Sequence, residues 1–157
     1  MGYLPAMAPF VVLASLFAVL RALGLLGVTF FAGWYTPLRF ALCGMFLLTA
    51  SAHWGKRRSD LVRMVPPRFP RPERLVTITG LLELAGAVGL LIPRLAPYAA
   101  LGLSLLLLSL FPANVHAART GLTIAGKPVT RIGLRTVLQT VFLAASLAIA
   151  LRGARLM

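Results

Sequence analysis

One acidic residue stands inside the apolar part of this sequence. Glu83 lies near the centre of the stretch TITGLLELAGAVGLLIP, which covers residues 77–93. About nine residues separate it from Arg74 and about as many from Pro93, so in a helix rising about 1.5 Å per residue its carboxyl is roughly 13 Å from either end. A charged acid at the middle of a bilayer costs at least about 2.5 kcal/mol on insertion scales. Glu83 is therefore expected to be paired, protonated or facing a wet cavity.

Arg21 is the natural charged partner for Glu83, because it lies near the middle of the first apolar block. Two alternatives are that Arg21 extends its side chain to the interface and that the first helix lies in the interface. Without a partner, the acid would take up a proton. Small residues surround Glu83 at the helical spacing of three and four, which favours close contact with other helices rather than with lipid. These neighbours are Thr79, Gly80, Gly86 and Ala87.

Other polar residues are expected together in the cytoplasmic half of the membrane, with Glu83 beneath them. They are Asn114, Gln139, Thr79, His53 and His116. One interpretation is a set of interhelical hydrogen bonds, each worth about 0.6 kcal/mol on average. The other is a polar pocket that opens to the cytoplasm, with Glu83 at its floor. The predicted ligand-binding residues are Glu83, Asn114, Gln139, Thr79, His53 and Arg21.

Motifs for familiar catalytic sites are missing from the sequence. It has no zinc-ligand spacing, no phosphate-binding loop, no dinucleotide-binding glycine motif, and only three acids from which to build a catalytic triad. Cys43 is the single cysteine and is expected to be a packing thiol. His53 and His116 could ligate haem iron, but histidines at a membrane interface are the favoured interpretation. We therefore expect no metal and no cofactor of the chain's own, and no complete catalytic set, which leaves enzymatic activity uncertain.

Composition places these residues in a membrane protein. Hydrophobic residues make up 59% of the 157 and charged residues 12%, and the mean hydropathy is +0.90. Soluble domains are about 45–50% apolar and about 25% charged. Five apolar blocks are each long enough to be candidate spans, at residues 9–32, 38–54, 75–92, 97–118 and 132–151. The expected fold is all-α: a membrane four-helix bundle in residues 37–157 with one additional N-terminal transmembrane helix in residues 1–36.

Polar segments separate the blocks and carry most of the charge. Residues 55–74 hold four prolines at their centre and are expected to be mainly extended, with a short interfacial helix at 59–64. Residues 120–130 are expected to form a polar loop. With Arg135, these two segments and their edges contain eleven Lys and Arg, against four at the other end. The positive-inside rule puts the eleven in the cytoplasm and makes this a multi-pass protein of the cytoplasmic (inner) membrane. The net charge of +13 is assigned to lipid headgroups and not to nucleic acid.

Three motifs in this order resemble the DoxX-like family of small membrane proteins. They are AHW at residues 52–54, MVPPRFPRPERLVTITGLLELAGAVGLLIP at 64–93 and LFPANVHAA at 110–118. The resemblance covers about residues 38–151 and implies a four-helix membrane bundle. It implies that the family's glutamate is Glu83, its asparagine Asn114, its histidine His53 and its proline pair Pro66 and Pro67. The family is associated with a quinol oxidase and with thiosulfate–quinone and thiol redox systems.

Three functions follow as hypotheses. The first is a non-enzymatic accessory subunit or scaffold in a membrane redox or quinone-linked system. The second is a protein that binds a quinone or another lipid-like ligand in a pocket around Glu83. The third is a quinol-linked oxidoreductase subunit, which would need an electron carrier from a partner. Membrane lipids, redox-complex subunits and a second copy of the chain are the expected partners.

Overall fold

The computed structural model describes residues 4–124, 127–128 and 130–155, and in these residues the protein is helical apart from one very short ribbon. The all-α class expected from the sequence is confirmed. The elements are α1 (Leu4–Leu25), η1 (Thr29–Phe31), α2 (Tyr35–Ser51), α3 (Arg58–Met64), α4 (Pro72–Leu91), α5 (Ala96–Arg119), β1 (Thr123–Ile124), β2 (Lys127–Pro128) and α6 (Ile132–Ala154).

Local sequence signals explain where the central helix α4 begins and ends. Pro72 takes the first helical position, where its missing N–H costs nothing, and Glu73 in the first turn complements the helix dipole. Arg71 before it adopts a left-handed φ of 54°. The helix stops at Leu91, because Pro93 follows two residues later. The predicted short interfacial helix at 59–64 is also present, as α3.

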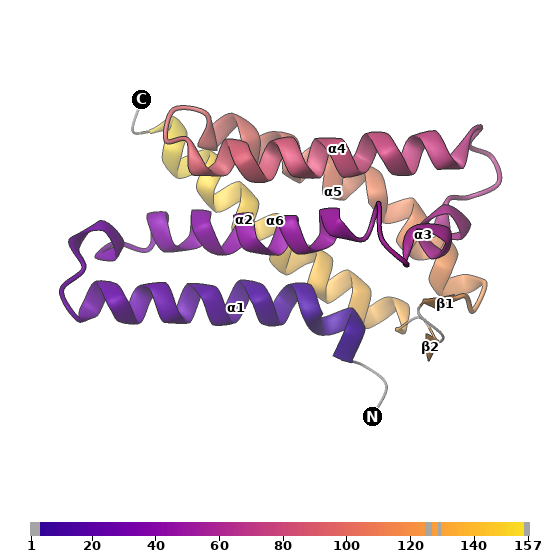
Figure 1. Cartoon of the computed structure of the whole chain (residues 1–157), viewed down its shortest axis with the longest axis horizontal. Helices are drawn as coiled ribbons and strands as arrows, with labels where there is room; N and C mark the ends of the chain where they lie inside the picture. The colour runs from indigo at the N-terminus through magenta and orange to yellow at the C-terminus, as the bar shows by residue number, and fades with distance from the viewer. Residues whose placement is uncertain (1–3, 125–126, 129, 156–157) are drawn as a thin grey trace.

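Four helices form a bundle, and the fifth long helix lies on its outside. α4 packs against α2 and α5, while α6 packs against α5 and also contacts α2. α1 runs antiparallel to α2 and packs mainly on it (Figure 1). The core lies between the four bundle helices, and its largest fully buried side chains include Phe46, Leu42, Leu90, Leu103 and Ile149. This is the predicted four-helix bundle with one additional N-terminal helix.

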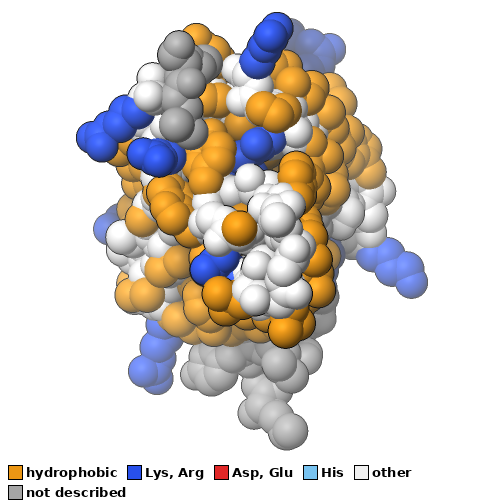
Figure 2. Space-filling model, turned by 90° about the vertical axis from the view of Figure 1, so that its left-hand side faces the viewer, with side chains coloured by type: hydrophobic (Ala, Val, Ile, Leu, Met, Phe, Trp, Pro, Cys, Tyr) orange, Lys and Arg blue, Asp and Glu red, His pale blue; other side chains and the backbone are white. Residues whose placement is uncertain are grey.

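The two ends of the bundle differ. Figure 1 shows α3, the β1–β2 ribbon and the start of α4 together at one end, which we call the α3 end. The α1–α2 and α4–α5 connections lie at the opposite end, which we call the turn end. Both strongly basic segments of the sequence are thus at the α3 end, as the alternation of five helices predicts. Figure 2 looks onto the turn end, where most visible atoms are hydrophobic side chains or other uncharged groups and no acidic side chain is visible among the described residues.

The outer surface of the helices suits contact with lipid. Four helices are long and apolar enough to cross a membrane: α1 over Met7–Leu25, α4, α5 and α6. α2 has 17 residues and is somewhat shorter, at about 25 Å. Leu81, Leu84 and Leu91 of α4 are 52%, 39% and 41% exposed, so they point away from the bundle. Length and composition together indicate a multi-pass membrane protein.

The loop between α5 and α6 contains a short ribbon that the sequence did not predict. Residues 120–130 are predicted to form a polar loop, and within this loop Thr123 pairs with Pro128 and Ile124 with Lys127 in a short antiparallel ribbon. Gly121, with φ of 63°, makes the turn out of α5 possible. Residues 125, 126 and 129 of the predicted loop lie outside the described residues.

Candidate functional site

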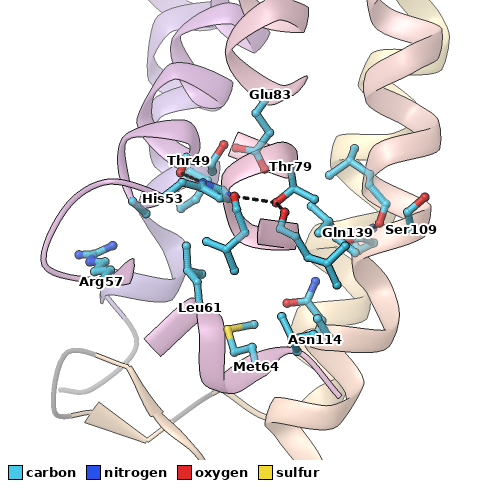
Figure 3. Close-up of a pocket in the computed structure, with 18 of the residues that line it drawn as sticks. Thr49, His53, Arg57, Leu61, Met64, Thr79, Glu83, Ser109, Asn114 and Gln139 are labelled. Carbon is cyan, nitrogen blue, oxygen red and sulfur yellow. Dashed lines mark hydrogen bonds between the residues drawn. The ribbon is translucent and has the colours of Figure 1, made fainter. Parts of the chain in front are cut away.

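A cavity of about 480 Å³ lies inside the bundle toward the α3 end. Residues from all six α-helices line it, and most of the lining is apolar. Five of the six predicted ligand-binding residues are among them: His53, Thr79, Glu83, Asn114 and Gln139. Figure 3 shows Glu83 at one end of the cavity and α3, with Leu61 and Met64, at the other. A cavity thus lies where a pocket around Glu83 was predicted, but its lining is mainly apolar and not polar.

Glu83 is buried in the wall of this cavity, with only 5% of its surface exposed. The side chain of Thr49 on α2 is its hydrogen-bond partner. The other carboxyl oxygen, Oε2, is buried without a partner among the described residues. Since buried polar atoms are usually satisfied, an unpartnered carboxyl oxygen beside an open cavity needs an explanation. The prediction that Glu83 faces protein and not lipid is confirmed.

Small residues around Glu83 allow the neighbouring helices to come close. A Cβ at Gly80 would lie 2.6 Å from the Cβ of His53, and a Cβ at Gly86 would lie 2.6 Å from the Cγ of Leu103. Ala87, one turn beyond Glu83, is fully buried. The small-residue face of α4 thus packs against α2 and α5, as its spacing predicted.

His53 follows the last turn of α2 and contributes an imidazole to the cavity. Its Nδ1 lies 3.2 Å from the backbone oxygen of Thr49, and because a carbonyl only accepts, Nδ1 carries the proton in this bond. Burial lowers the pKa of His53 below its usual value, and the charge of Arg58 acts in the same direction. The imidazole is therefore neutral at pH 7, with Nε2 as an acceptor.

Asn114 and Gln139 reach the cavity from α5 and α6. Arg135 Nη1 donates to Asn114 Oδ1 over 2.6 Å, and since arginine only donates, this contact leaves the Asn114 Nδ2 group as a donor for other partners. Gln139 Nε2 donates to the backbone oxygen of Leu107. Pro112 lies inside α5, five residues after the Leu107 carbonyl that accepts this bond.

Arg21 does not belong to this site, so its predicted pairing with Glu83 is wrong. Its guanidinium donates to the backbone oxygens of Phe31 at 3.2 Å and Ala32 at 2.6 Å, in the connection between α1 and α2. That connection is at the turn end (Figure 1), whereas Glu83 faces the cavity toward the α3 end. The side chain of Arg21 is long enough to reach carbonyls that the turn leaves free, and these bonds satisfy its charge locally.

Several residues of the site were missed at the sequence level. Thr49 is one, although its position four residues before His53 on one helix face could have indicated it. Arg57, Leu61 and Met64 are the others, from the segment that holds α3. Nothing in a short basic helix signals that its apolar side chains will close a cavity formed by other helices.

Two buried polar atoms without a partner bear on what the site could hold. Besides Glu83 Oε2, Arg135 Nε is buried without a partner in the described residues, next to Asn114. Within the same described residues, no three His, Cys, Asp or Glu side chains come together in a way that could hold a metal ion. The arrangement can fix the polar head of an apolar molecule by hydrogen bonds.

Comparison with known proteins gives one match. Residues 42–150 match the family described as Domain of unknown function (DUF8561), and this match does not support the assignment to the DoxX-like family. No curated protein matches the chain. No solved structure matches it either. Because the match spans more than half of the chain and includes Thr49, Glu83, Asn114 and Gln139, this protein belongs to the DUF8561 family.

Proposed function

We propose that this protein binds a small apolar molecule, a quinone or another lipid-like ligand, in the cavity around Glu83. The main evidence is the carboxyl oxygen Oε2 of Glu83. This oxygen is buried in the cavity wall and has no hydrogen-bond partner among the described residues. A carboxyl that only had to hold helices together would bond to a neighbouring helix through both oxygens. An unpartnered oxygen in a residue that lines a cavity is suited to a ligand group that can hydrogen-bond to it.

Size and lining support the same function. Pockets for small molecules commonly measure about 300–1,000 Å³ and are mainly apolar with a few polar groups. This cavity, at about 480 Å³, falls within that range, and Phe46, Leu107 and Phe142 contribute apolar surface to it. Glu83, Asn114 and Gln139 supply the few polar groups, from three different helices. The ligand would thus have an apolar body and a polar head.

The redox setting of this proposal rests on the DoxX-like resemblance alone. A quinol-linked reaction would need an electron carrier supplied by another subunit. Ligand binding does not depend on that partner, so it can be tested on the isolated protein.

Apolar molecules that co-purify from native membranes test the proposal. They would be extracted from the protein in mild detergent and quantified by mass spectrometry. Ala113→Phe places a large side chain in the cavity lining, and Ala85→Phe places the same side chain on the exposed surface of α4. We expect a molecule bound to wild type and Ala85→Phe that is lost from Ala113→Phe.

Glu83→Gln adds a second measurement, because it keeps the shape of the side chain but alters its hydrogen bonding. We expect the folded variant to retain less ligand than wild type. Equal ligand content in wild type, Ala113→Phe and Glu83→Gln would overturn the proposal. That result would favour the alternative of a scaffold or accessory subunit, which needs no occupied cavity.

A further inference from the structure

A threonine hydroxyl in the cavity wall has already used its proton. Thr79 Oγ1 donates to the backbone oxygen of Leu75 over 2.9 Å. Figure 3 shows this bond beside the cavity. A hydroxyl has one proton and two lone pairs, so the Thr79 oxygen remains able to accept but not to donate.

The other polar groups at the Glu83 end also accept. Because His53 Nδ1 donates to the Thr49 carbonyl, Nε2 of the neutral ring is an acceptor. Gln139 has directed its amide nitrogen to the carbonyl of Leu107, which leaves Oε1. Whether or not the carboxyl of Glu83 carries a proton, at least one of its oxygens accepts. The donors lie farther away, beside Asn114: its own Nδ2, since its oxygen is held by Arg135, and Arg135 Nε, which has no partner among the described residues.

The charges around the cavity argue against an ionic head group. Arg57 lines the cavity, and Arg58 donates to the backbone oxygen of His53 over 2.8 Å, so a cation would meet two guanidinium groups near the α3 end. An anionic head group at the Glu83 end would instead meet the hydrogen-bond acceptors there. An uncharged head with hydroxyl groups matches the acceptors without adding charge to a buried space.

We infer that the ligand of this cavity is a neutral amphiphile with a hydroxyl head group, of the alkyl phenol or alkyl diol class, whose hydroxyls donate to the acceptors around Glu83. The inference rests on the proposed ligand-binding function and narrows it. A quinone presents only acceptors to this wall, whereas its quinol presents two hydroxyl donors. The hydroxyl donors of the quinol therefore match the acceptors of the cavity wall, and the carbonyls of the quinone do not.

A matched pair of probes tests this inference. Hexylresorcinol has an apolar chain and two hydroxyls, and its dimethyl ether has the same skeleton without donors. Binding of each to purified wild-type protein in detergent would be measured by isothermal titration calorimetry, together with hexylbenzylamine as a cationic probe. We expect the diol to bind about tenfold more tightly than the ether, because each buried acceptor left unmatched costs affinity.

Two variants distinguish recognition from general loss of structure. Glu83→Gln replaces one acceptor by an amide donor, so the preference for the diol over the ether should fall, even if both bind more weakly. Thr79→Val removes an acceptor at similar volume and should reduce the preference in the same way. Ala85→Phe, on the exposed face of α4, should leave the ratio unchanged.

The outcomes separate the two proposals. Equal binding of diol and ether to wild type, or tighter binding of the amine than of the diol, would overturn the hydroxyl head group but leave a ligand-binding cavity. An unchanged ratio in both Glu83→Gln and Thr79→Val would also overturn it, because recognition would then not involve these acceptors. Absence of binding by all three probes, with no co-purified molecule, would overturn the proposed function as well.

Discussion

Gly80 lies where α4 passes the end of α2, and one added methyl group there should disturb both the packing and the cavity. A Cβ at this position would lie 2.6 Å from His53 Cβ, 2.7 Å from His53 Cγ and 3.0 Å from Trp54 Cη2. Ordinary van der Waals contact begins at 3.4 Å, so His53 would have to move by about 0.8 Å. The buried imidazole is also held by its bond to the Thr49 carbonyl, so it cannot move without weakening that bond.

The size of the effect follows from comparison with a second glycine. Gly102 on α5 has nothing within 4 Å of the position that a Cβ would take, so Gly102→Ala gains the same helix propensity as Gly80→Ala without the overlap. Overpacking of a tight contact costs about 1–3 kcal/mol. At about 2–4 °C per kcal/mol for a chain of this size, Gly80→Ala should melt about 2–12 °C below Gly102→Ala.

Thermal unfolding of both variants in the same detergent, followed by tryptophan fluorescence, measures this difference. The amount of co-purified ligand is a second reading, because displacement of His53 changes the cavity wall. If Gly80→Ala and Gly102→Ala had the same melting temperature, the close approach of α4 to His53 would be refuted. The argument that Gly80 shapes the cavity would then be refuted as well.

The remaining predictions concern orientation and charge. In intact cells, a cysteine at Arg68 should be protected from an impermeant thiol reagent and one at Arg94 should react, and the opposite pattern would reverse the topology. Arg39→Met should lower the melting temperature more than Arg94→Met. Buried Arg39 donates to the carbonyls of Leu90 and Leu91 at the end of α4. Hydrogen bonds to charged donors are worth about 1.5–3 kcal/mol each. In a double-mutant cycle, Glu83→Gln and Arg21→Leu should be additive within about 0.5 kcal/mol, and a larger coupling energy would restore the pairing that the structure excludes.

Much of the architecture could be predicted because hydrophobic length and the positions of proline report directly on membrane helices. The bounds of α4, α5 and α6 lie within three residues of those expected. The inward direction of Glu83 followed from its small neighbours, since glycine and alanine mark a face that other helices approach. The arrangement of both basic segments at one end followed from the alternation of five helices.

The partners of the charged residues could not be predicted in the same way. Arg21 and Glu83 are each central in their own apolar block, but depth does not tell which way a long side chain extends. The α1–α2 turn presents backbone oxygens that the sequence does not reveal, and Arg21 bonds to those. The role of α3 was also hidden, because closing a cavity depends on where a short helix packs and not on its own residues.

The energetics of Glu83 favour a role beyond packing. An acid inside a membrane bundle carries a desolvation cost that a leucine would avoid, and Arg21, the candidate expected to offset it, is bonded elsewhere. The structure offsets part of this cost through Thr49 only, and leaves Oε2 unpartnered among the described residues. Gly80, Gly86 and Ala87 nevertheless hold α4 close to its neighbours, so the bundle does not need the carboxyl to bring its helices together. A group that costs stability, is not required for packing and lines a cavity is best explained by a ligand that binds in that cavity.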